Sequence, residues 1–410
     1  LLSRALHRLR TTAPRVISSP PTQPRRAAVA LVLRVVPAPG TSPSGLSSTQ
    51  IHASQLTLSD FFAQEWVSHP GARPEILFLH RSNPGKSEAE VAGDSHVAFP
   101  GGRMEQDDED GLFTAMRHTW EEIGIDLAEA DYMTIGQLDD REITTSLGKR
   151  LLMILSPFVF LQLTSHSRPV DPSPDTTLHW VPLASLLPSP SLALPHSISY
   201  PEPIWSSVNI DTASRLAPRH SIALKLVMRV LVGSMQFPAL VLVPPSEYGC
   251  ADVKRPRAME AGSGTRTPPL KLWGLTLGMT LDLLAYMAPQ PLTPWDADAL
   301  MGITGVDPSP GTRGRQRRVN APPSLTSVFP RFSYPDVNFW IWVFGKRYRE
   351  VIRGWETSVR NGGLNDRRIN WTGAALTTFY AAVRKALVVV LILRALGLLV
   401  GVAVGLWWVL

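Results

Sequence analysis

The residues best suited to chemistry lie together in residues 99–125, which read FPGGRMEQDDEDGLFTAMRHTWEEIGI. This run combines a Gly-Gly turn, a cluster of acids over residues 105–110 and two adjacent carboxylates, Glu121 and Glu122. Adjacent carboxylates on an exposed surface repel each other, and a hard cation such as Mg²⁺, which prefers oxygen ligands, removes that repulsion. The run therefore predicts a divalent-metal site suited to pyrophosphate chemistry.

A helix over residues 111–123 is expected to position these side chains. Its buried stripe is predicted from the i, i+4, i+7 and i+11 spacing of Leu112, Met116, Thr119 and Ile123. On the opposite face, a spacing of four residues pairs Arg117 with Glu121 and His118 with Glu122. Gly124 is expected to end the helix. Taken alone, the pattern also suits a solvated helix with a charged outer face and no chemistry.

The same run resembles the Nudix box, G-x(5)-E-x(7)-R-E-U-x-E-E-x-G-U, in which U is bulky and apolar. The second half of the box is matched by Arg117, Thr119 at the first U, Glu121, Glu122, Gly124 and Ile125. Glu109 takes the place of the isolated Glu of the box. The resemblance implies a Nudix hydrolase: an α/β/α sandwich with a mixed sheet that cleaves nucleoside diphosphate compounds with Mg²⁺ or Mn²⁺.

The residues around the box are similar to the coenzyme A diphosphatase branch of that family, whose members are peroxisomal or mitochondrial. Gly102 lies one residue further from Arg117 than the general box allows, and AFPGG precedes the acids. The branch reads roughly A-F-P-G-G-[KR]-x-D-x-x-D, which is matched here by Arg103, by Glu105 in place of the first Asp, and by Asp108. Arg81-Ser82 and the run KLWGLTLGMTLDLL at residues 271–284 also resemble it.

The resemblance implies a role for each matched residue. Glu121 and Glu122 hold the metal, and Arg117 orients Glu121. Gly101 and Gly102 allow the backbone to approach the metal or the substrate, and Arg81 and Arg103 bind substrate phosphate. The acids Glu105, Asp108 and Glu109 support the loop. The implied reaction splits coenzyme A or its thioesters into 3′,5′-ADP and 4′-phosphopantetheine.

One position departs from the family. The Arg-Glu of the box is Arg117-His118 here, and a neutral imidazole is a poor Mg²⁺ ligand that accepts Mn²⁺ or softer ions. His118 is therefore a weak metal ligand, or an exposed helix residue with no role. Two other functions stay open: a Nudix hydrolase of another compound, such as ADP-ribose, a dinucleotide or an oxidised nucleotide, and a weakened Nudix fold that serves as a membrane-bound sensor or scaffold.

Composition limits the partners. The formal charge is +6, but residues 1–59 hold seven Arg and no acid, so the remainder carries +6 − 7 = −1. The chain therefore lacks a broad basic face for a nucleic-acid duplex, and a small-molecule substrate is expected instead. The single Cys250 excludes an internal disulfide and a multi-cysteine metal site.

The two ends of the chain predict a targeting segment and a membrane helix. Residues 1–25 form a basic leader that is rich in Arg and Ser, with Leu alternating with basic residues, which is typical of a mitochondrial transit peptide; a disordered leader is the alternative. Residues 386–410 are apolar except for Arg394 and are long enough to cross a bilayer. They predict a membrane-anchored protein, mitochondrial rather than peroxisomal, with a buried C-terminal core helix as the alternative.

Between the ends, residues 26–290 are predicted to form the Nudix domain, with long irregular insertions at about 38–72 and 190–269. Strands are expected near residues 25–37, 74–80, 131–140, 151–163 and 176–183 because these runs are β-branched and apolar. Residues 291–380 are predicted to be a linker and an aromatic and basic extension. That extension suits either a membrane surface or a helix packed on the Nudix fold.

Overall fold

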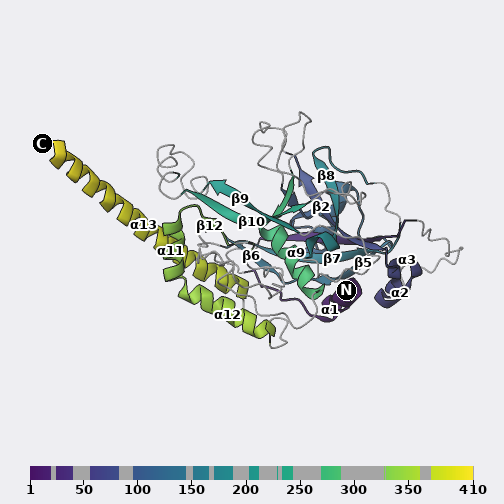
Figure 1. Cartoon of the computed structure of the whole chain (residues 1–410). Helices are drawn as coiled ribbons and strands as arrows, with labels where there is room; N and C mark the ends of the chain where they lie inside the picture. The colour runs from purple at the N-terminus through teal and green to yellow at the C-terminus, as the bar shows by residue number, and fades with distance from the viewer. Residues whose placement is uncertain are drawn as a thin grey trace, which may run out of the picture. The chain divides into compact units, whose positions relative to one another are not determined.

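The computed structural model describes residues 1–19, 25–39, 56–82, 96–144, 151–165, 170–187, 203–211, 229, 233–242, 269–287, 327, 329–360 and 371–409. These residues divide into two compact units. Figure 1 labels their helices and strands. Unit 1 comprises Leu1–Asp140, Ile154–Ser206 and Ala239–Ala288, and unit 2 comprises Arg141–Met153, Ser207–Pro238 and Pro289–Leu410. Of the linker and extension predicted over residues 291–380, residues 291–326 lie outside the described residues. The domain boundaries given above stay predictions.

The core of unit 1 is a mixed sheet with the order β3-β2-β1-β7-β5. Its strands are β1 (Arg26–Val36), β2 (Arg73–Arg81), β3 (Val97–Ala98), β5 (Tyr132–Gln137) and β7 (Leu151–Gln162). β1 runs parallel to β7 and antiparallel to β2. Off this path, β4 (Gly101–Arg103) pairs with β1 and β8 (Thr176–Pro182) pairs with β2. The strands predicted from the β-branched runs are all confirmed.

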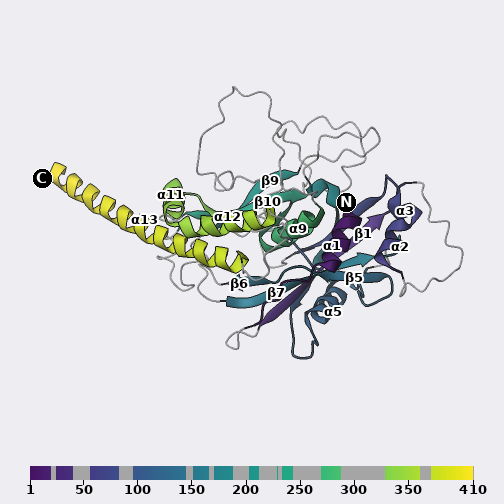
Figure 2. The ribbon, with the colours of Figure 1, turned by 90° about the horizontal axis from the view of Figure 1, so that it is seen from below.

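Helices cover both faces of this sheet, as Figure 2 shows for α5 (Gly111–Ile123) on one side and α1 (Leu2–Thr11) and α9 (Gly274–Met287) on the other. Alternating residues of a strand point to opposite faces. Ala28, Ala30 and Val32 of β1 accordingly pack with the α5 side, and the buried Leu31 and Leu33 point to the other side. The predicted α/β/α sandwich with a mixed sheet is therefore confirmed.

Helix α5 has the predicted bounds. The Asp110 side chain caps its first turn by accepting a 2.7 Å hydrogen bond from the Phe113 backbone N–H. At the other end Gly124 has a φ of 71°, the left-handed conformation that stops a helix. Of the predicted stripe, Thr119 and Ile123 are buried, and Leu112 and Met116 are partly buried against the same cluster.

The N-terminal segment packs into unit 1. α1 buries Leu2, Ala5, Leu6 and Leu9 and contacts α9 and β5. Beyond the helix, the backbone N–H groups of Arg15 and Ile17 each donate a 2.9 Å hydrogen bond, to Asp139 and Asp140 respectively. The amphipathic helix read from the sequence is thus present, with its apolar face buried. A role as a cleaved transit peptide stays a prediction.

The predicted insertions contain regular structure. Residues 38–72 hold the short helices α2 (Leu58–Ala63) and α3 (Glu65–Ser68). Residues 190–269, predicted to be irregular, include β9 (Ile204–Asp211) and β10 (Ser234–Leu242), and residues 239–242 of β10 pair with β11 (Leu270–Trp273). These short strands were not predicted because this part of the sequence is rich in proline, which is rare inside strands. The small helix α6 (Leu183–Leu186) follows β8.

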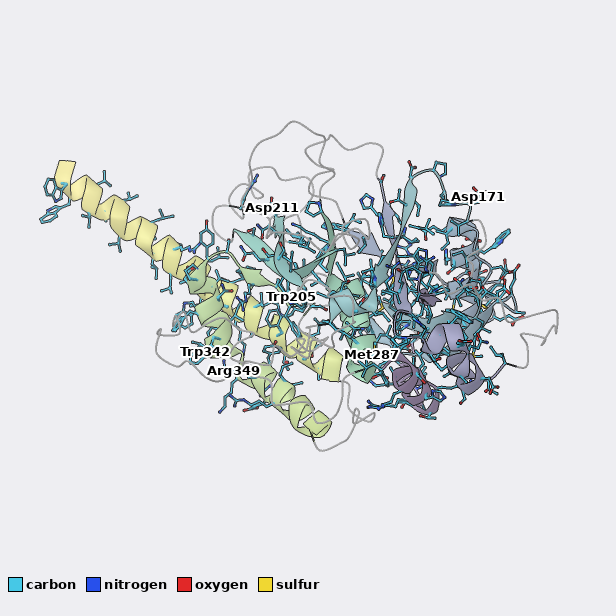
Figure 3. The ribbon with its side chains drawn as sticks, turned by 45° about the vertical axis from the view of Figure 1, so that its right-hand side comes forward. Asp171, Trp205, Asp211, Met287, Trp342 and Arg349 are labelled. Atoms are coloured by element: carbon cyan, nitrogen blue, oxygen red, sulfur yellow. The ribbon has the colours of Figure 1, made fainter. Side chains whose placement is uncertain are left out.

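Unit 2 is mainly helical. It contains β6 (Arg141–Thr144), β12 (Arg331–Phe332), α11 (Pro335–Phe344), α12 (Lys346–Arg360) and α13 (Trp371–Val409). α11 and α12 both pack on α13, where side chains such as Val337, Ile352 and Phe379 form one apolar cluster. Figure 3 labels Trp342 of α11 and Arg349 of α12, whose guanidinium lies 4.8 Å from the centre of the Trp342 ring.

The C-terminal hydrophobic helix is confirmed, but it begins at Trp371 rather than at residue 386. Its first half is buried in the apolar cluster of unit 2, which includes Ala375, Phe379 and Val390. Its second half is exposed. The buried first half matches the core helix that was the alternative prediction, because the tertiary packing stops partway along the helix. A membrane span for the exposed half stays a prediction.

Candidate active site

Strand β4 places the Gly-Gly turn beneath helix α5. In the antiparallel register of β1 and β4, Gly102 lies opposite Ala28 and Gly101 opposite Val29. Gly101 has a φ of 145°, and a Cβ there would collide with the carbonyl oxygen of Ala28. A Cβ on Gly102 would overlap the ring of His118. The close approach that requires glycine at residue 102 is therefore to His118, and the predicted approach to metal or substrate stays a prediction.

Arg117 and Asp108 form the central ion pair of the site. The Arg117 Nε and Nη2 donate to the two Asp108 carboxylate oxygens at 2.8 and 2.9 Å. The same carboxylate accepts a 2.8 Å hydrogen bond from the Glu105 backbone N–H and a 3.0 Å hydrogen bond from the Thr114 hydroxyl. Hydrogen bonds from Arg117 hold the pKa of Asp108 well below its usual range, and Asp108 in turn raises the pKa of Arg117.

Arg117 also reaches two exposed carboxylates. Its Nη1 lies 3.1 Å from Glu121 Oε1, which confirms the predicted spacing of four residues, and 3.4 Å from Glu105 Oε1. The Glu121 and Glu105 side chains are 47% and 65% exposed, so both carboxylates face solvent. Arg117 therefore lies at the centre of three carboxylates.

His118 and Glu122 do not form the predicted pair. The His118 Nε2 lies 3.0 Å from the backbone carbonyl oxygen of Arg103, and its Nδ1 lies 3.6 Å from a Glu121 oxygen. Glu122 instead accepts two hydrogen bonds from Arg81, from Nε to Oε1 and from Nη2 to Oε2, the latter at 2.8 Å. The prediction was wrong because β4 and the end of β2 bring partners that helix spacing cannot show.

Two of the remaining predicted residues, Arg103 and Glu109, are exposed. The backbone carbonyl oxygen of Arg103 lies beside the His118 ring. Glu109, the residue aligned with the isolated Glu of the box, is exposed on the loop. Asp108, one residue earlier, is buried and holds Arg117. Thr114, which donates to Asp108, was not predicted from the sequence; its position three residues before Arg117 on the same helix face is the signal that could have found it.

The carboxylate oxygens of this site suit a hard cation, but within the described part of the chain three such metal ligands do not converge on one point. Among the described residues, no three His, Cys, Asp or Glu side chains converge as a metal site. The carboxylates of Glu121 and Glu122 are the oxygen donors that Mg²⁺ and Mn²⁺ prefer. In this structure Arg117 and Arg81 are the cations that hold these two carboxylates.

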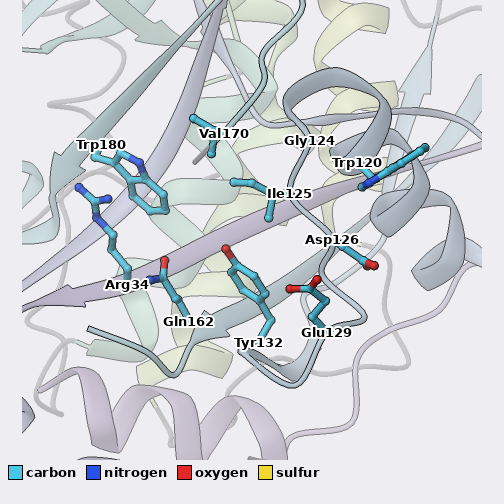
Figure 4. A pocket seen from close by; sticks show the side chains of 10 residues that line it. All are labelled: Arg34, Trp120, Gly124, Ile125, Asp126, Glu129, Tyr132, Gln162, Val170 and Trp180. Atoms are coloured by element: carbon cyan, nitrogen blue, oxygen red, sulfur yellow. The ribbon is translucent and has the colours of Figure 1, made fainter. Parts of the chain in front are cut away.

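A pocket of about 340 Å³ lies beside the C-terminal end of α5 (Figure 4). It is lined by Arg34, Trp120, Gly124, Ile125, Asp126, Glu129, Tyr132, Gln162, Val170 and Trp180. The Arg34 guanidinium stacks 4.0 Å from the centre of the Trp180 ring and donates to Glu75 at 2.7 Å. None of the predicted site residues lines this pocket, so it is separate from the Arg117 network.

Comparison with known proteins supports the superfamily that the box predicts. Residues 67–202 match the family model described as the NUDIX domain. An uncharacterized protein of Schizosaccharomyces pombe is 29% identical over 197 residues, which cover 47% of this chain and 52% of that protein. The chain thus spans about half the length of this curated relative.

Two solved structures are similar at low identity. A Nudix hydrolase from M. smegmatis, RenU, has 16% sequence identity and a TM-score of 0.22 over 39% of this chain and 72% of that chain. A MutT/nudix family protein from Enterococcus faecalis has 13% identity and a TM-score of 0.23 over 44% of this chain and 48% of that chain. TM-scores this low add nothing to the fold established by the strands and helices themselves.

The contact between Gly102 and His118 gives a first testable prediction. Gly102→Ala is expected to destabilise the fold by about 1–3 kcal/mol, because an added methyl group in a packed contact forces neighbours to move. The measurement is the free energy of unfolding in urea for Gly102→Ala in the wild-type and His118→Ala backgrounds. His118→Ala should remove most of the effect. An equal loss in both backgrounds would show that His118 is not the obstacle.

Proposed function

We propose that the chain hydrolyses the pyrophosphate bond of coenzyme A or an acyl-coenzyme A, giving 3′,5′-ADP and the corresponding 4′-phosphopantetheine. The observation that carries the proposal is the Arg117 network, which holds Glu121 beside Glu105 and Asp108 on one end of a Nudix helix. The AFPGG run and Arg81-Ser82 support coenzyme A among nucleoside diphosphate substrates.

Each residue of the network has a chemical task in this proposal. Glu121 and Glu122 are the residues that would hold Mg²⁺ or Mn²⁺. When bound, such an ion neutralises diphosphate oxygens and lowers the pKa of water. Asp108 fixes the Arg117 guanidinium, which in turn orients Glu121. Arg81 lies at the end of β2, and its guanidinium now binds the Glu122 carboxylate. It can bind a substrate phosphate instead, because a guanidinium pairs in a bidentate way with carboxylates and phosphates alike.

The proposal includes a membrane tether. Among the described helices, Gly373–Trp408 of α13 is long and apolar enough to cross a membrane. Its exposed C-terminal half supports anchoring, and the Arg-rich segment at residues 1–25 supports a mitochondrial membrane. A soluble small molecule would then be hydrolysed at a membrane surface.

The second testable prediction concerns Glu122. Glu122→Gln is expected to lower hydrolysis at least 100-fold with the fold intact, because an amide is a poor ligand for a hard cation. Product formation is measured over a panel of coenzyme A compounds, ADP-ribose, dinucleotides and oxidised nucleotides, with Mg²⁺ and with Mn²⁺. Glu65→Gln, an exposed acid on α3, is the matched control. Turnover of another panel member in place of coenzyme A would identify a different Nudix substrate, and an unchanged rate for Glu122→Gln would refute the metal-site assignment.

A binding or scaffold role is the second candidate. The observation in its favour is that His118 stands at the position of a family carboxylate, packed against Gly102, and that Glu122 is held by Arg81. The family carboxylate is therefore absent at residue 118, and the Glu122 carboxylate is already paired with the Arg81 guanidinium. Absence of hydrolysis for the whole panel with both metals, together with measurable binding of a panel compound by calorimetry, would favour this role.

A further inference from the structure

The second half of α13 is apolar on every side and extends beyond α11 and α12 (Figures 1 and 2). From Ala395 to Trp408 each residue is exposed, and none is charged. The successive residues Leu398, Leu399 and Val400 are 66%, 66% and 62% exposed, so the described residues leave every face of the helix uncovered. A protein partner covers one face of a helix, whereas lipid covers all of them. This surface therefore fits a phospholipid bilayer.

A charged and aromatic group of side chains marks the point where the exposed half begins. The Arg394 Nη2 lies 2.6 Å from Asp336 Oδ2, and the guanidinium lies 4.5 Å from the centre of the Tyr334 ring. These three side chains form the Arg394 group. The Asp336 side chain is 44% exposed and the Arg394 side chain 25%, so the ion pair is open to its surroundings. Such a pair is stable in water or among lipid headgroups and is costly in hydrocarbon.

The strand before α11 limits how deeply unit 2 can enter a bilayer. β12 directly precedes the Arg394 group, and its Arg331 and Phe332 pair with Gln236 and Met235 of β10. Arg331 is exposed. An open strand edge does not lie in hydrocarbon, because its backbone groups find no water there. β12 and the Arg394 group therefore lie outside the apolar layer, which begins beyond Arg394.

The helices α11 and α12 lead away from this boundary. Tyr348 of α12 has its ring centre 5.2 Å from that of Phe379, and Phe379 lies about 22 Å before Arg394 along α13. After Asp336 the chain therefore runs back along α13. In the other direction, residues 395–409 extend about 22 Å beyond Arg394. That length passes the middle of a hydrocarbon core about 30 Å thick.

We infer that unit 2 meets a phospholipid bilayer at the turn between β12 and α11, with the Arg394 group at the level of the headgroup phosphates and residues 395–409 in the apolar layer. Tyrosine and arginine are typical anchors at this level. Arg331 and Arg394 bring two guanidinium groups there against the one carboxylate of Asp336, which complements the charge of the phosphates. The inference rests on the membrane tether proposed above and adds the surface by which the folded unit contacts lipid.

The level of the boundary can be measured in the full chain. In a Cys250→Ser background, Pro335→Cys, Leu399→Cys and Arg353→Cys are each labelled with an environment-sensitive fluorophore and reconstituted into phosphatidylcholine vesicles. The vesicles carry a spin label either on the lipid headgroup or near the end of an acyl chain. The fluorophore at residue 399 should be quenched mainly by the chain label, the one at residue 335 mainly by the headgroup label, and the one at residue 353 by neither.

The other outcomes separate the inference from the tether. Stronger quenching at residue 335 by the chain label than by the headgroup label would place the Arg394 group in the apolar layer and overturn the inference. Quenching at residue 399 with none at residue 335 would hold unit 2 away from the lipid surface, which overturns the inference and leaves the tether. Quenching at neither residue would overturn the tether as well, as expected if a second copy of the chain covers the helix.

The ion pair gives an independent test. Asp336→Ala should leave unchanged the fraction of full chain that resists alkaline carbonate extraction, because Arg394 at the headgroup level takes a lipid phosphate as its anion. Leu399→Arg should lower that fraction at least twofold, because it puts a charge into the apolar layer. Glu350→Ala, which removes an exposed acid of α12, is the matched control. A loss for Asp336→Ala as large as that for Leu399→Arg, or no loss for Leu399→Arg, would overturn the inference.

Discussion

Replacing Asp108 with alanine is expected to lower the free energy of unfolding by about 3–5 kcal/mol, the usual effect of removing one partner of a buried ion pair. The Asp108 side chain is 1% exposed, and Arg117 is 19% exposed. Without Asp108, the Arg117 guanidinium keeps only the exposed Glu121 and Glu105 as acidic partners. Such a loss is a large part of the stability of a typical domain, about 5–15 kcal/mol. Urea denaturation of the full chain measures it.

Glu109→Ala is the matched control, because Glu109 is the exposed neighbour that aligns with the isolated Glu of the Nudix box. Its effect is expected to be within about 0.5 kcal/mol, as for most surface substitutions. Comparable losses for the two variants would contradict the assignment of Asp108 as the residue that holds Arg117.

The effect of Asp108→Ala should depend on pH in a defined direction. Arg117 depresses the pKa of Asp108 in the folded chain, so the ionised carboxylate stabilises the fold. This contribution is fully present above the unfolded pKa of about 3.9 and falls as the pH drops below it. The difference between wild type and Asp108→Ala should therefore be constant between about pH 5 and 8 and should shrink under acidic conditions.

Deleting residues 1–19 is expected to prevent unit 1 from folding. The deletion uncovers the surface that buries Leu2, Leu6 and Leu9, and each buried leucine contributes about 1.5–3 kcal/mol. It also removes the backbone donors that Arg15 and Ile17 provide to Asp139 and Asp140, although Arg26 still reaches Asp140 at 2.8 Å. The sum is comparable to the whole stability of a typical domain. Soluble yield and the cooperative loss of circular dichroism on heating measure the effect.

Arg4→Gln separates folding from targeting. Arg4 is exposed on α1, so its replacement should leave the stability of unit 1 unchanged while removing one basic charge of the leader. A deletion variant as stable as the full chain would show that residues 1–19 are dispensable for the fold, as expected of a cleaved leader. Loss of stability would show that a mature chain needs this segment.

Local sequence determined the elements of this protein. The bounds of α5 followed from an apolar period of 3.6 residues, an acid before the first turn and Gly124 after the last. The pairing of Arg117 with Glu121 followed from helix geometry alone. The strands of the mixed sheet followed from runs of β-branched residues. These features depend on neighbours in the sequence, so a single sequence suffices to predict them.

Tertiary structure decided which residues meet. The choice of Asp108 over Glu109 depends on which carboxylate the loop turns inward, and the pairing of Glu122 with Arg81 depends on where β2 ends. The contacts of Ile17 with Asp140 and of Arg394 with Asp336 join segments far apart in the sequence. Long-range contacts of this kind follow from packing of the whole chain, since no local period relates residues separated by tens of positions. The sequence could therefore select candidate residues for the site, and only the fold could assign their partners.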